Sequence, residues 1–417
     1  MRVFAFGSNG SGQLAIGHTE DVSAPTECLF TSPAPTDKIT KIAAGGNHTL
    51  LLTDSGHVHA TGCNTDKRCG PSQIQNPQDK DKDQDQDARE SQIEENILRF
   101  RRLILTDPVT TENVDTFKCI STTWEGSILV SSAGDKVFVL GSTPKGELGL
   151  GNDLVATNPS PTQIFVEPGL SIPDFPPSRT TVVSVASGMG HTVAILSSGE
   201  VYGWGGSRKG QLGESLKKEK IVWRPAKVEG IPFLATGAVC GREFTVILGR
   251  RSAGEFVILG DEGNRWGIMR IPESLRFAAE GSGGGWSEYI DIGASWHDIY
   301  VHASSSHSDS DIGFDSLNAR AAGSLIAWGR NDRGQLPPPD LPPLSEIGVG
   351  SEHVLALLEN GDVATFGWGE HGNCGPDTDA RGNVAGKYNL IPLPGDVSGA
   401  RVVGVGAGCA TSWVIVE

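Results

Sequence analysis

Three histidines recur in one short pattern, and histidine is the side chain best suited to acid–base or metal chemistry near neutral pH. The pattern is Gly-x-x-His, and its three copies run from Gly45 to His48, from Gly188 to His191 and from Gly350 to His353. Each copy belongs to a different unit of a longer repeat, so the imidazoles are expected to lie far apart. We therefore expect no catalytic residue and no metal ligand among them. Their expected role is to hydrogen-bond backbone within their own turns and to tie neighbouring units together.

Three other turns of the same kind carry large or charged side chains in place of small ones. These side chains are Trp124 and Glu125, Arg242 and Glu243, and Trp296, His297 and Asp298. A large aromatic ring in a tight surface turn is typical of an anchor for a protein partner. We predict that Trp296 and Asp298 are the main anchors, with Asp298 facing a basic group of the partner and the other residues in support. The alternative is that the tryptophan rings fold back over the tops of their own units.

The sequence lacks the residue patterns needed for a zinc site, a catalytic nucleophile or a phosphate-binding loop. The seven cysteines are scattered, and the closest pair, Cys63 and Cys69, has no second pair to complete a zinc site. This usage indicates reduced thiols in a cytosolic or nuclear protein. No spacing suggests a nucleophile with its base, and no phosphate-binding glycine loop precedes a helix. We expect a protein that is not an enzyme and that holds neither cofactor nor metal.

Composition and net charge further limit the classes of molecule that the chain is expected to bind. The chain has 417 residues and a net charge of −16, which disfavours direct DNA binding because a polyphosphate backbone would be repelled. No apolar run is long enough to span a membrane, and no secretory signal is visible at the start. The chain is long enough to bury a large core, and its 55 glycines are best used in turns.

The elements that carry these turns repeat along the whole chain. Each unit contains a short apolar strand, the turn described above, a second strand, a tight glycine turn and a third strand that ends in glycine. A loop then leads to a fourth strand. The glycines that end the third strands are Gly7, Gly62, Gly141, Gly205, Gly260, Gly329 and Gly367. Trp204 and Trp328, near the ends of two third strands, are expected in the core.

The two ends of the chain complete one unit. The chain starts with a third strand and finishes with a first and a second strand in "RVVGVGAGCATSWVIVE". We therefore predict an all-β fold for residues 1–417, a single seven-bladed β-propeller of four-stranded antiparallel blades. The N- and C-terminal strands share one blade, which closes the ring and leaves only short strand edges. The polar segment 76–96 is predicted to be a disordered insertion, and 302–323 a flexible one.

These motifs resemble the regulator of chromosome condensation repeat. The resemblance rests on the Gly-x-x-His turns and on the Gly-x-Asn-x-x-Gly-Gln-Leu segments at 7–14 and 329–336. It covers nearly the whole chain and implies the propeller fold, but not one function, because such propellers serve unrelated roles.

The opening "VFAFGSNGSGQL" further resembles the fungal alpha-tubulin suppressor group of this family. That resemblance implies a cytoplasmic and nuclear propeller that forms a heterodimer with a small zinc- or iron-binding protein of the CSL type. The pair would act in diphthamide biosynthesis on elongation factor two and in Elongator-dependent modification of wobble uridines in tRNA, with the metal held by the partner. The alternative is a guanine-nucleotide exchange factor or binding protein for a Ran-type small GTPase. The chain has no basic tail of the kind that usually accompanies that role.

Overall fold

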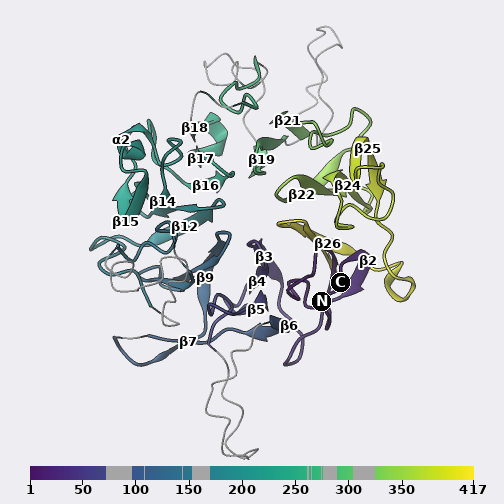
Figure 1. Cartoon of the computed structure of the whole chain (residues 1–417), viewed down its shortest axis with the longest axis horizontal. Coiled ribbons are helices and arrows are strands. Elements are labelled where there is room, and N and C mark those ends of the chain that lie inside the picture. The colour runs from purple at the N-terminus through teal and green to yellow at the C-terminus, as the bar shows by residue number, and fades with distance from the viewer. Residues whose placement is uncertain are drawn as a thin grey trace, which may run out of the picture.

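Seven small antiparallel sheets surround a central axis in the computed structural model (Figure 1). The structure describes residues 1–71, 96–107, 109–142, 144–152, 170–260, 263, 265–273, 275, 289–303 and 325–417. The predicted seven-bladed β-propeller is thus confirmed. We number the blade that contains both chain ends as blade 1 and the others in chain order.

Four blades show four strands each. Blade 1 consists of β26 (Val402–Ala407), β27 (Thr411–Val416), β1 (Arg2–Gly7) and β2 (Val22–Glu27). Blade 2 consists of β3 (Ile39–Ala44), β4 (His48–Thr53), β5 (Val58–Cys63) and β6 (Asn96–Arg102). Blade 4 consists of β12 (Val182–Ser187), β13 (His191–Leu196), β14 (Val201–Gly206) and β15 (Ile221–Lys227). Blade 7 consists of β22 (Leu344–Val349), β23 (His353–Leu358), β24 (Val363–Trp368) and β25 (Asn383–Leu390).

The other three blades show three strands each within the described ranges. Blade 3 consists of β9 (Phe117–Thr122), β10 (Gly126–Ser131) and β11 (Val137–Gly141), and blade 5 of β16 (Gly237–Cys240), β17 (Phe244–Leu248) and β18 (Phe256–Gly260). Blade 6 consists of β19 (Tyr289–Ala294), β20 (Asp298–Ala303) and β21 (Leu325–Gly329). In blade 3, Leu170 and Ile172 hydrogen-bond to β11 where a fourth strand would lie.

Short elements complete the described part. They are the hairpin of β7 (Leu105–Thr106) and β8 (Asn113–Val114), the helix α2 (Glu214–Lys217) and the 3-10 turns Arg251–Ala253 and Gly395–Val397. None of the described helices has the length and apolar character needed to cross a bilayer. Most of the predicted insertions 76–96 and 302–323 lies outside the described residues. Only their edges are described, with Asn96 at the start of β6 and His302 and Ala303 at the end of β20.

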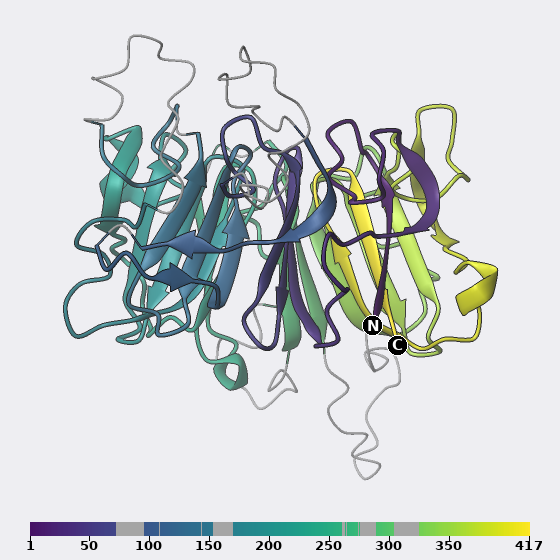
Figure 2. The same cartoon turned by 90° about the horizontal axis from the view of Figure 1, so that it is seen from below.

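Blade 1 closes the ring as predicted. Its strand order is β2-β1-β27-β26, and β1 pairs with β27 from Arg2 opposite Val416 to Gly7 opposite Thr411. Both chain ends therefore lie side by side on one face of the ring (Figure 2). Neither half of this blade can form its sheet without the other.

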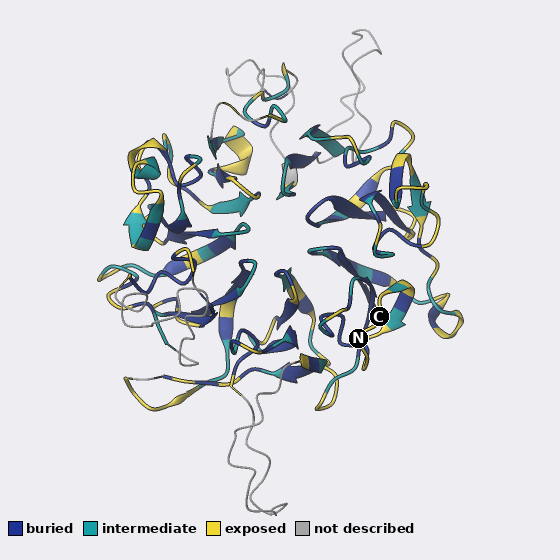
Figure 3. Ribbon diagram, in the orientation of Figure 1, coloured by how far each residue is buried: buried dark blue, intermediate teal, exposed yellow. Residues whose placement is uncertain are grey.

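The hydrophobic core is divided into seven clusters, one between each pair of neighbouring blades. Alternation along a strand sends successive side chains to opposite neighbours. In β1, Val3 and Ala5 pack toward blade 2, whereas Phe4 and Phe6 pack toward blade 7. Burial is greatest in the second strands, lower in the first strands next to the axis and weakest in the outermost strands (Figure 3).

The predicted glycines end the third strands for a steric reason. Each third strand ends at its predicted glycine or one residue beyond it. A Cβ on Gly7 would lie 2.4 Å from the carbonyl oxygen of Ala410, in the turn that precedes the neighbouring second strand. The φ angle of Gly7 is +114°, which a residue with a side chain rarely adopts. Both restrictions favour glycine at this position.

The repeat histidines join neighbouring blades. The Nε2 atom of His48 lies 3.0 Å from the hydroxyl of Ser127 in the next blade, and that hydroxyl donates to the carbonyl oxygen of Arg68. The same relay runs from His191 to Thr245 and Gln211, and from His353 to Ser412 and Asn373. The predicted link between blades is confirmed. The predicted partner within the histidine's own turn was wrong, because the imidazole reaches across the blade interface.

These relays are structural despite their likeness to a nucleophile with its base. His48 and Ser127 are both fully buried, so no substrate reaches them. Burial lowers the pKa of His48 to about 3 and those of His191 and His353 to about 4. The imidazoles are therefore neutral at physiological pH.

In every blade, a backbone carbonyl oxygen in the loop after the third strand accepts a hydrogen bond from a hydroxyl or indole group. The acceptors are the carbonyl oxygens of Gln13, Arg68, Glu147, Gln211, Ile268, Gln335 and Asn373. Thr49, Ser127, Thr245 and Ser412 donate hydroxyl protons, and Trp204 and Trp328 donate indole protons. All six donate from the next blade. The acceptor Gln335 is the exception, since Tyr300 of its own blade donates to it. Both predicted core tryptophans are confirmed as buried.

Removal of residues 411–417, which include the whole of β27, should prevent folding of the entire propeller. Strand β1 would lose its partner, and two core clusters would lose Trp413, Val414 and Val416. Circular dichroism melts of the truncated chain should show no cooperative transition. Deletion of the exposed Glu417 alone is the control and should leave the melt intact. A truncated chain that melts as the full chain does would contradict closure through blade 1.

The free energy of unfolding should fall as the pH drops from about 6.5 toward 4. In this range the unfolded chain protonates its histidines while the buried imidazoles resist protonation, since the pKa of His191 is lowered from 6.5 to about 4. Each such histidine contributes at most about 1.4 kcal/mol per pH unit. His191→Phe should flatten the profile, and Phe244 shows that the position accepts phenylalanine. Urea unfolding across this range measures the slope.

The exposed His18 provides the control for this experiment. His18→Gln should keep the wild-type slope. If His191→Phe also kept it, the buried histidine would not be a source of the acid sensitivity.

Candidate functional site

The seven turns between first and second strands meet around the mouth of the central channel. Residues from all seven blades line a shallow cavity of about 140 Å³ there. The carbonyl-bearing loops after the third strands lie on the same face, because strand direction alternates within each blade. We call this the turn face.

Two of the predicted anchors face each other across this mouth. The rings of Trp124, from blade 3, and Trp296, from blade 6, have their centroids 5.9 Å apart with 45° between their planes. Both side chains are half-buried. Trp124 also covers the neighbouring turn, since a Cβ on Gly46 would lie 2.7 Å from its ring. The rings thus fold over the channel mouth and leave part of their surface open to solvent.

Backbone hydrogen bonds from blade to blade hold these turns in place. The donor–acceptor pairs are Gly46 to Trp124 (2.9 Å), Trp124 to Met189 (3.0 Å), Arg242 to Trp296 (3.1 Å), Trp296 to Ser351 (2.9 Å) and Ser351 to Gly408 (2.9 Å). Main-chain groups make these bonds, so they constrain the turns whatever the side chain at the tip.

The other predicted residues surround the tryptophans. Arg242 is exposed, and its guanidinium carbon lies 5.5 Å from the centroid of the Trp296 ring. Glu243 is exposed beside it, while Glu125 is half-buried and accepts a hydrogen bond from the hydroxyl of Ser142 at 3.2 Å. Arg242 and Trp296 form a cation–π pair that presents a broad, rigid surface.

The prediction that Asp298 is an exposed anchor is wrong. It occupies the position that His48 holds in the repeat, at the start of its second strand, and only 1% of it is exposed. Its carboxylate accepts a hydrogen bond from the Ser295 hydroxyl at 2.5 Å. Burial raises the pKa of Asp298 to about 7, and nearby Glu352 raises it further. A carboxylate enclosed in this way cannot contact a partner directly, so its expected place on the surface was wrong.

His297 is half-buried and neutral. Burial lowers the pKa of its imidazole to about 4, and the charges of Arg330 and Arg242 act in the same direction. Its Nδ1 atom lies 4.0 Å from a carboxylate oxygen of Glu352. Because the imidazole is neutral, this approach is not an ion pair. Glu352 is instead paired with the guanidinium groups of Arg330 and Arg333.

Five residues of this face were not predicted from the sequence. Arg265 and Arg330 stack on Trp266, with guanidinium carbons 4.7 and 5.0 Å from the ring centroid, and Arg333 lies 5.1 Å from that of Trp368. Trp266 and Arg333 directly precede the glycine of the loop after the third strand. The same position holds Lys145 in blade 3 and Lys209 in blade 4, so a comparison of the loops could have singled it out.

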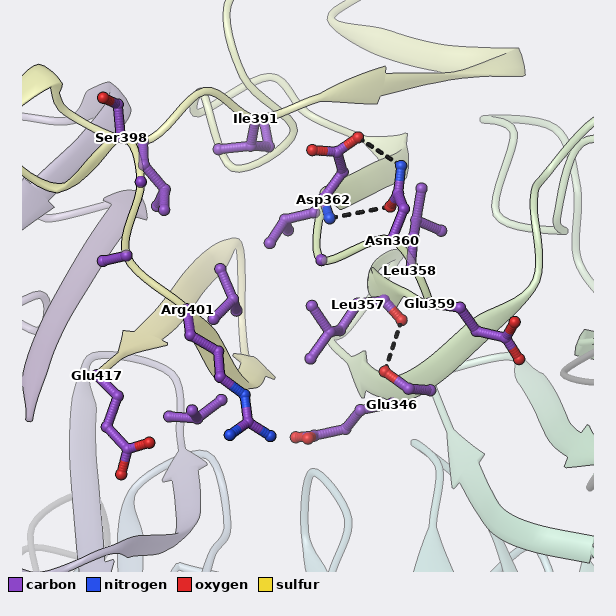
Figure 4. Close-up of a pocket in the computed structure, with 18 of the residues that line it drawn as sticks. Glu346, Leu357, Leu358, Glu359, Asn360, Asp362, Ile391, Ser398, Arg401 and Glu417 are labelled. Atoms are coloured by element: carbon purple, nitrogen blue, oxygen red, sulfur yellow. Dashed lines mark hydrogen bonds between the residues drawn. The ribbon is translucent and has the colours of Figure 1, made fainter.

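The opposite face holds a larger pocket, of about 990 Å³, between blades 7 and 1 (Figure 4). Arg401 and Glu346 point into it, and the turn at Asn360 and Asp362 forms one rim. Its charged lining mixes both signs, and no aromatic side chain contributes to it. Neither pocket holds a recognisable metal site, since no group of three histidine, cysteine or acidic side chains with metal-binding geometry occurs in the described ranges.

Known repeats match two parts of the chain. The regulator of chromosome condensation (RCC1) repeat matches residues 2–52 and 198–248, and a second description of the same repeat matches 39–68 and 182–211. Together with the seven blades, these matches show that the chain contains RCC1 repeats and folds as a propeller.

Several proteins resemble this RCC1-repeat propeller over most of their length. An RCC1 repeat-containing protein of Schizosaccharomyces pombe, C10F6.04, is 28% identical over 100% of this chain and 99% of its own. The secretion-regulating guanine nucleotide exchange factor of Mus musculus is 26% identical over 97% of this chain and 82% of its own.

Solved structures support the fold. Human WBSCR16 superposes with a TM-score of 0.69 and 18% identity over 100% of both chains. Prp20p from Saccharomyces cerevisiae superposes with a TM-score of 0.68 and 18% identity, over 99% of this chain and 90% of its own. At this identity, the likeness concerns the fold alone.

Replacement of Asp298 by Asn should stabilise the propeller at pH 8 and change little near pH 5. The raised pKa means that the folded protein keeps a proton that the unfolded chain releases, so wild-type stability falls as the pH rises from about 4 to about 7. Asparagine carries no charge at either pH. We expect a gain of at least about 1 kcal/mol at pH 8, measured by urea unfolding.

The exposed Asp54 serves as the control, and Asp54→Asn should act equally at both pH values. An Asp298→Asn effect that did not depend on pH would show that the native carboxyl ionises normally.

Proposed function

We propose that this RCC1-repeat propeller is a non-enzymatic scaffold that binds a protein partner on its turn face. The main support is the pair of half-buried tryptophans, Trp124 and Trp296, fixed by backbone hydrogen bonds at the channel mouth. Large rigid aromatic side chains flanked by arginine are enriched among residues that dominate binding energy. They lose little conformational entropy on binding, because the turns are already ordered.

The first candidate partner is a small zinc- or iron-binding protein of the CSL type. The resemblance of the first residues to the fungal alpha-tubulin suppressor group supports this choice. In this proposal the two proteins form a heterodimer in the cytoplasm and nucleus that serves diphthamide biosynthesis and, with the Elongator complex, tRNA wobble-uridine modification. The metal belongs to the partner, and the propeller supplies a binding surface.

The second candidate is a Ran-type small GTPase. The mouse relative is named as a guanine nucleotide exchange factor, and the yeast Prp20p structure was described with its binding to Gsp1p and histones. On this alternative, the same face would bind the GTPase and promote nucleotide release.

Trp296→Ala should weaken binding of the true partner by at least about 2 kcal/mol, which is the scale of a hot-spot residue. Trp124→Ala should have a similar effect, because each ring positions the other. Calorimetric titration with a purified CSL-type protein and with purified Ran measures both variants against wild type. Trp223→Ala, on the outer strand β15, is the matched control for loss of a half-buried tryptophan.

Three results would separate the candidates. Binding of the CSL-type protein that depends on Trp296 supports the heterodimer. Binding of Ran with faster nucleotide release supports the exchange-factor alternative. Binding that survives both tryptophan substitutions but is lost on changes at the opposite face would contradict the turn face as the docking surface.

A further inference from the structure

Charge is distributed unevenly over the turn face. Blades 4 to 6 place a cluster of basic side chains around Trp266 and Trp296, which we call the basic sector. Its members are Lys209, Arg242, Arg265, Arg330 and Arg333. Acidic side chains gather in the loops of blades 7 and 1, at Glu370, Asp377, Asp379, Glu20 and Asp21. The basic sector is therefore a local exception on a chain with a net charge of −16.

The protein's own arginines already cover the exposed aromatic faces. Arg242 lies over Trp296, and Arg265 and Arg330 lie over Trp266. An incoming cation would have to displace them before it could use the same rings. A guanidinium stacked on an indole still has its N–H donors in the guanidinium plane, where they can bind a carboxylate with two parallel hydrogen bonds.

Among the residues that the structure describes, two of these arginines have no acidic partner of their own. Arg330 is paired with Asp332 and Glu352, and Arg333 with Glu352. By contrast, within the described residues no ion pair or side-chain hydrogen bond to a carboxylate involves Arg242 or Arg265. Both side chains are exposed. Their donors are thus available to a second molecule.

A small cavity lies beside them, because Arg265 lines it and Arg242 stacks on Trp296, which also lines it. It has a volume of about 190 Å³, and Lys209, Arg265, Trp266, Trp296 and His297 contribute to its wall, together with the carboxylate of Glu243. This is below the ~300–1,000 Å³ of typical small-molecule sites and suits an inserted side chain better. Asp298 and Glu352 are buried under the face, whereas Glu243 and Asp332 are exposed among the arginines, with Asp332 paired to Arg330.

We propose that the basic sector docks an acidic protein surface, with a partner carboxylate held by Arg242 and Arg265 at this cavity. The inference rests on the proposed docking function and reverses the charge that the sequence suggested for the partner. A nucleic acid also carries anions, but a long polyphosphate would extend over the acidic loops of blades 7 and 1 and be repelled. A folded acidic protein can confine its charge to the basic sector.

Two short synthetic peptides test the proposal without knowledge of the partner. One is rich in glutamate with a central phenylalanine, and the other has lysine in place of each glutamate. Tryptophan fluorescence reports binding. We expect the glutamate peptide to bind more tightly at low salt, and the double variant Arg242→Glu, Arg265→Glu to lose at least about tenfold in affinity. Arg381→Glu, an exposed charge reversal in the blade 7 loop, is the matched control and should lose far less.

Equal affinity for the two peptides, or an unchanged affinity in the double variant, would overturn the inference. Tighter binding of a single-stranded RNA oligonucleotide, lost in the same variant, would also overturn it in favour of a nucleic acid.

The purified CSL-type protein and Ran separate this inference from the proposed function. If binding of one of them depends on Trp296 but is unchanged by Arg242→Glu and Arg265→Glu, the proposed docking function holds. The inference of an acidic partner surface is then wrong. If neither binds, while the glutamate peptide binds through Arg242 and Arg265, the candidate partners fail and the acidic-surface inference stands.

Discussion

A buried hydrogen bond from one blade into a loop carbonyl of its neighbour organises the whole ring. Hydroxyl donors such as Thr49, Ser127 and Thr245 reach the loop that follows the preceding blade's third strand. In blades 4 and 6, the indole N–H of Trp204 or Trp328 makes the corresponding bond. Each bond contributes only about 1 kcal/mol net, but a buried carbonyl without a donor would cost more. The constraint therefore fixes the angle between the blades that it joins and the positions of six loops on the turn face. The loop of blade 6 is held by Tyr300 of its own blade.

That framework leaves the tips of the turns free to vary. The bonds between turns are made by backbone groups, and the relays use residues at the starts of second strands. The tip residue is Gly46 in blade 2, Trp124 in blade 3, Arg242 in blade 5 and Trp296 in blade 6. A rigid scaffold that positions variable surface residues is the usual arrangement for binding sites. In this propeller it brings two tryptophans from distant blades into one contact.

Burial then separates the charges of the turn face. Asp298 and Glu352 lie beneath the surface, where desolvation raises the pKa of each carboxyl. Arginine side chains remain outside because their long stems and planar heads can stack on indoles while keeping contact with water. The charge exposed on this part of the turn face thus differs in sign from the net charge of the chain. A strongly acidic chain can in this way carry a basic contact surface.

The sequence by itself determined the blade count, the seven glycines at the ends of the third strands and the closure of blade 1. These features follow from local periodicity and turn chemistry, which each unit repeats. It also identified Trp124, Trp296 and Arg242 as unusual turn residues, since they stand out against the other copies. Only the tertiary structure decided that His48 bonds to the next blade rather than its own turn, and that Asp298 is buried. The physical reason is that both depend on side chains from another blade, and no repeat pattern specifies what a neighbouring blade presents across the interface.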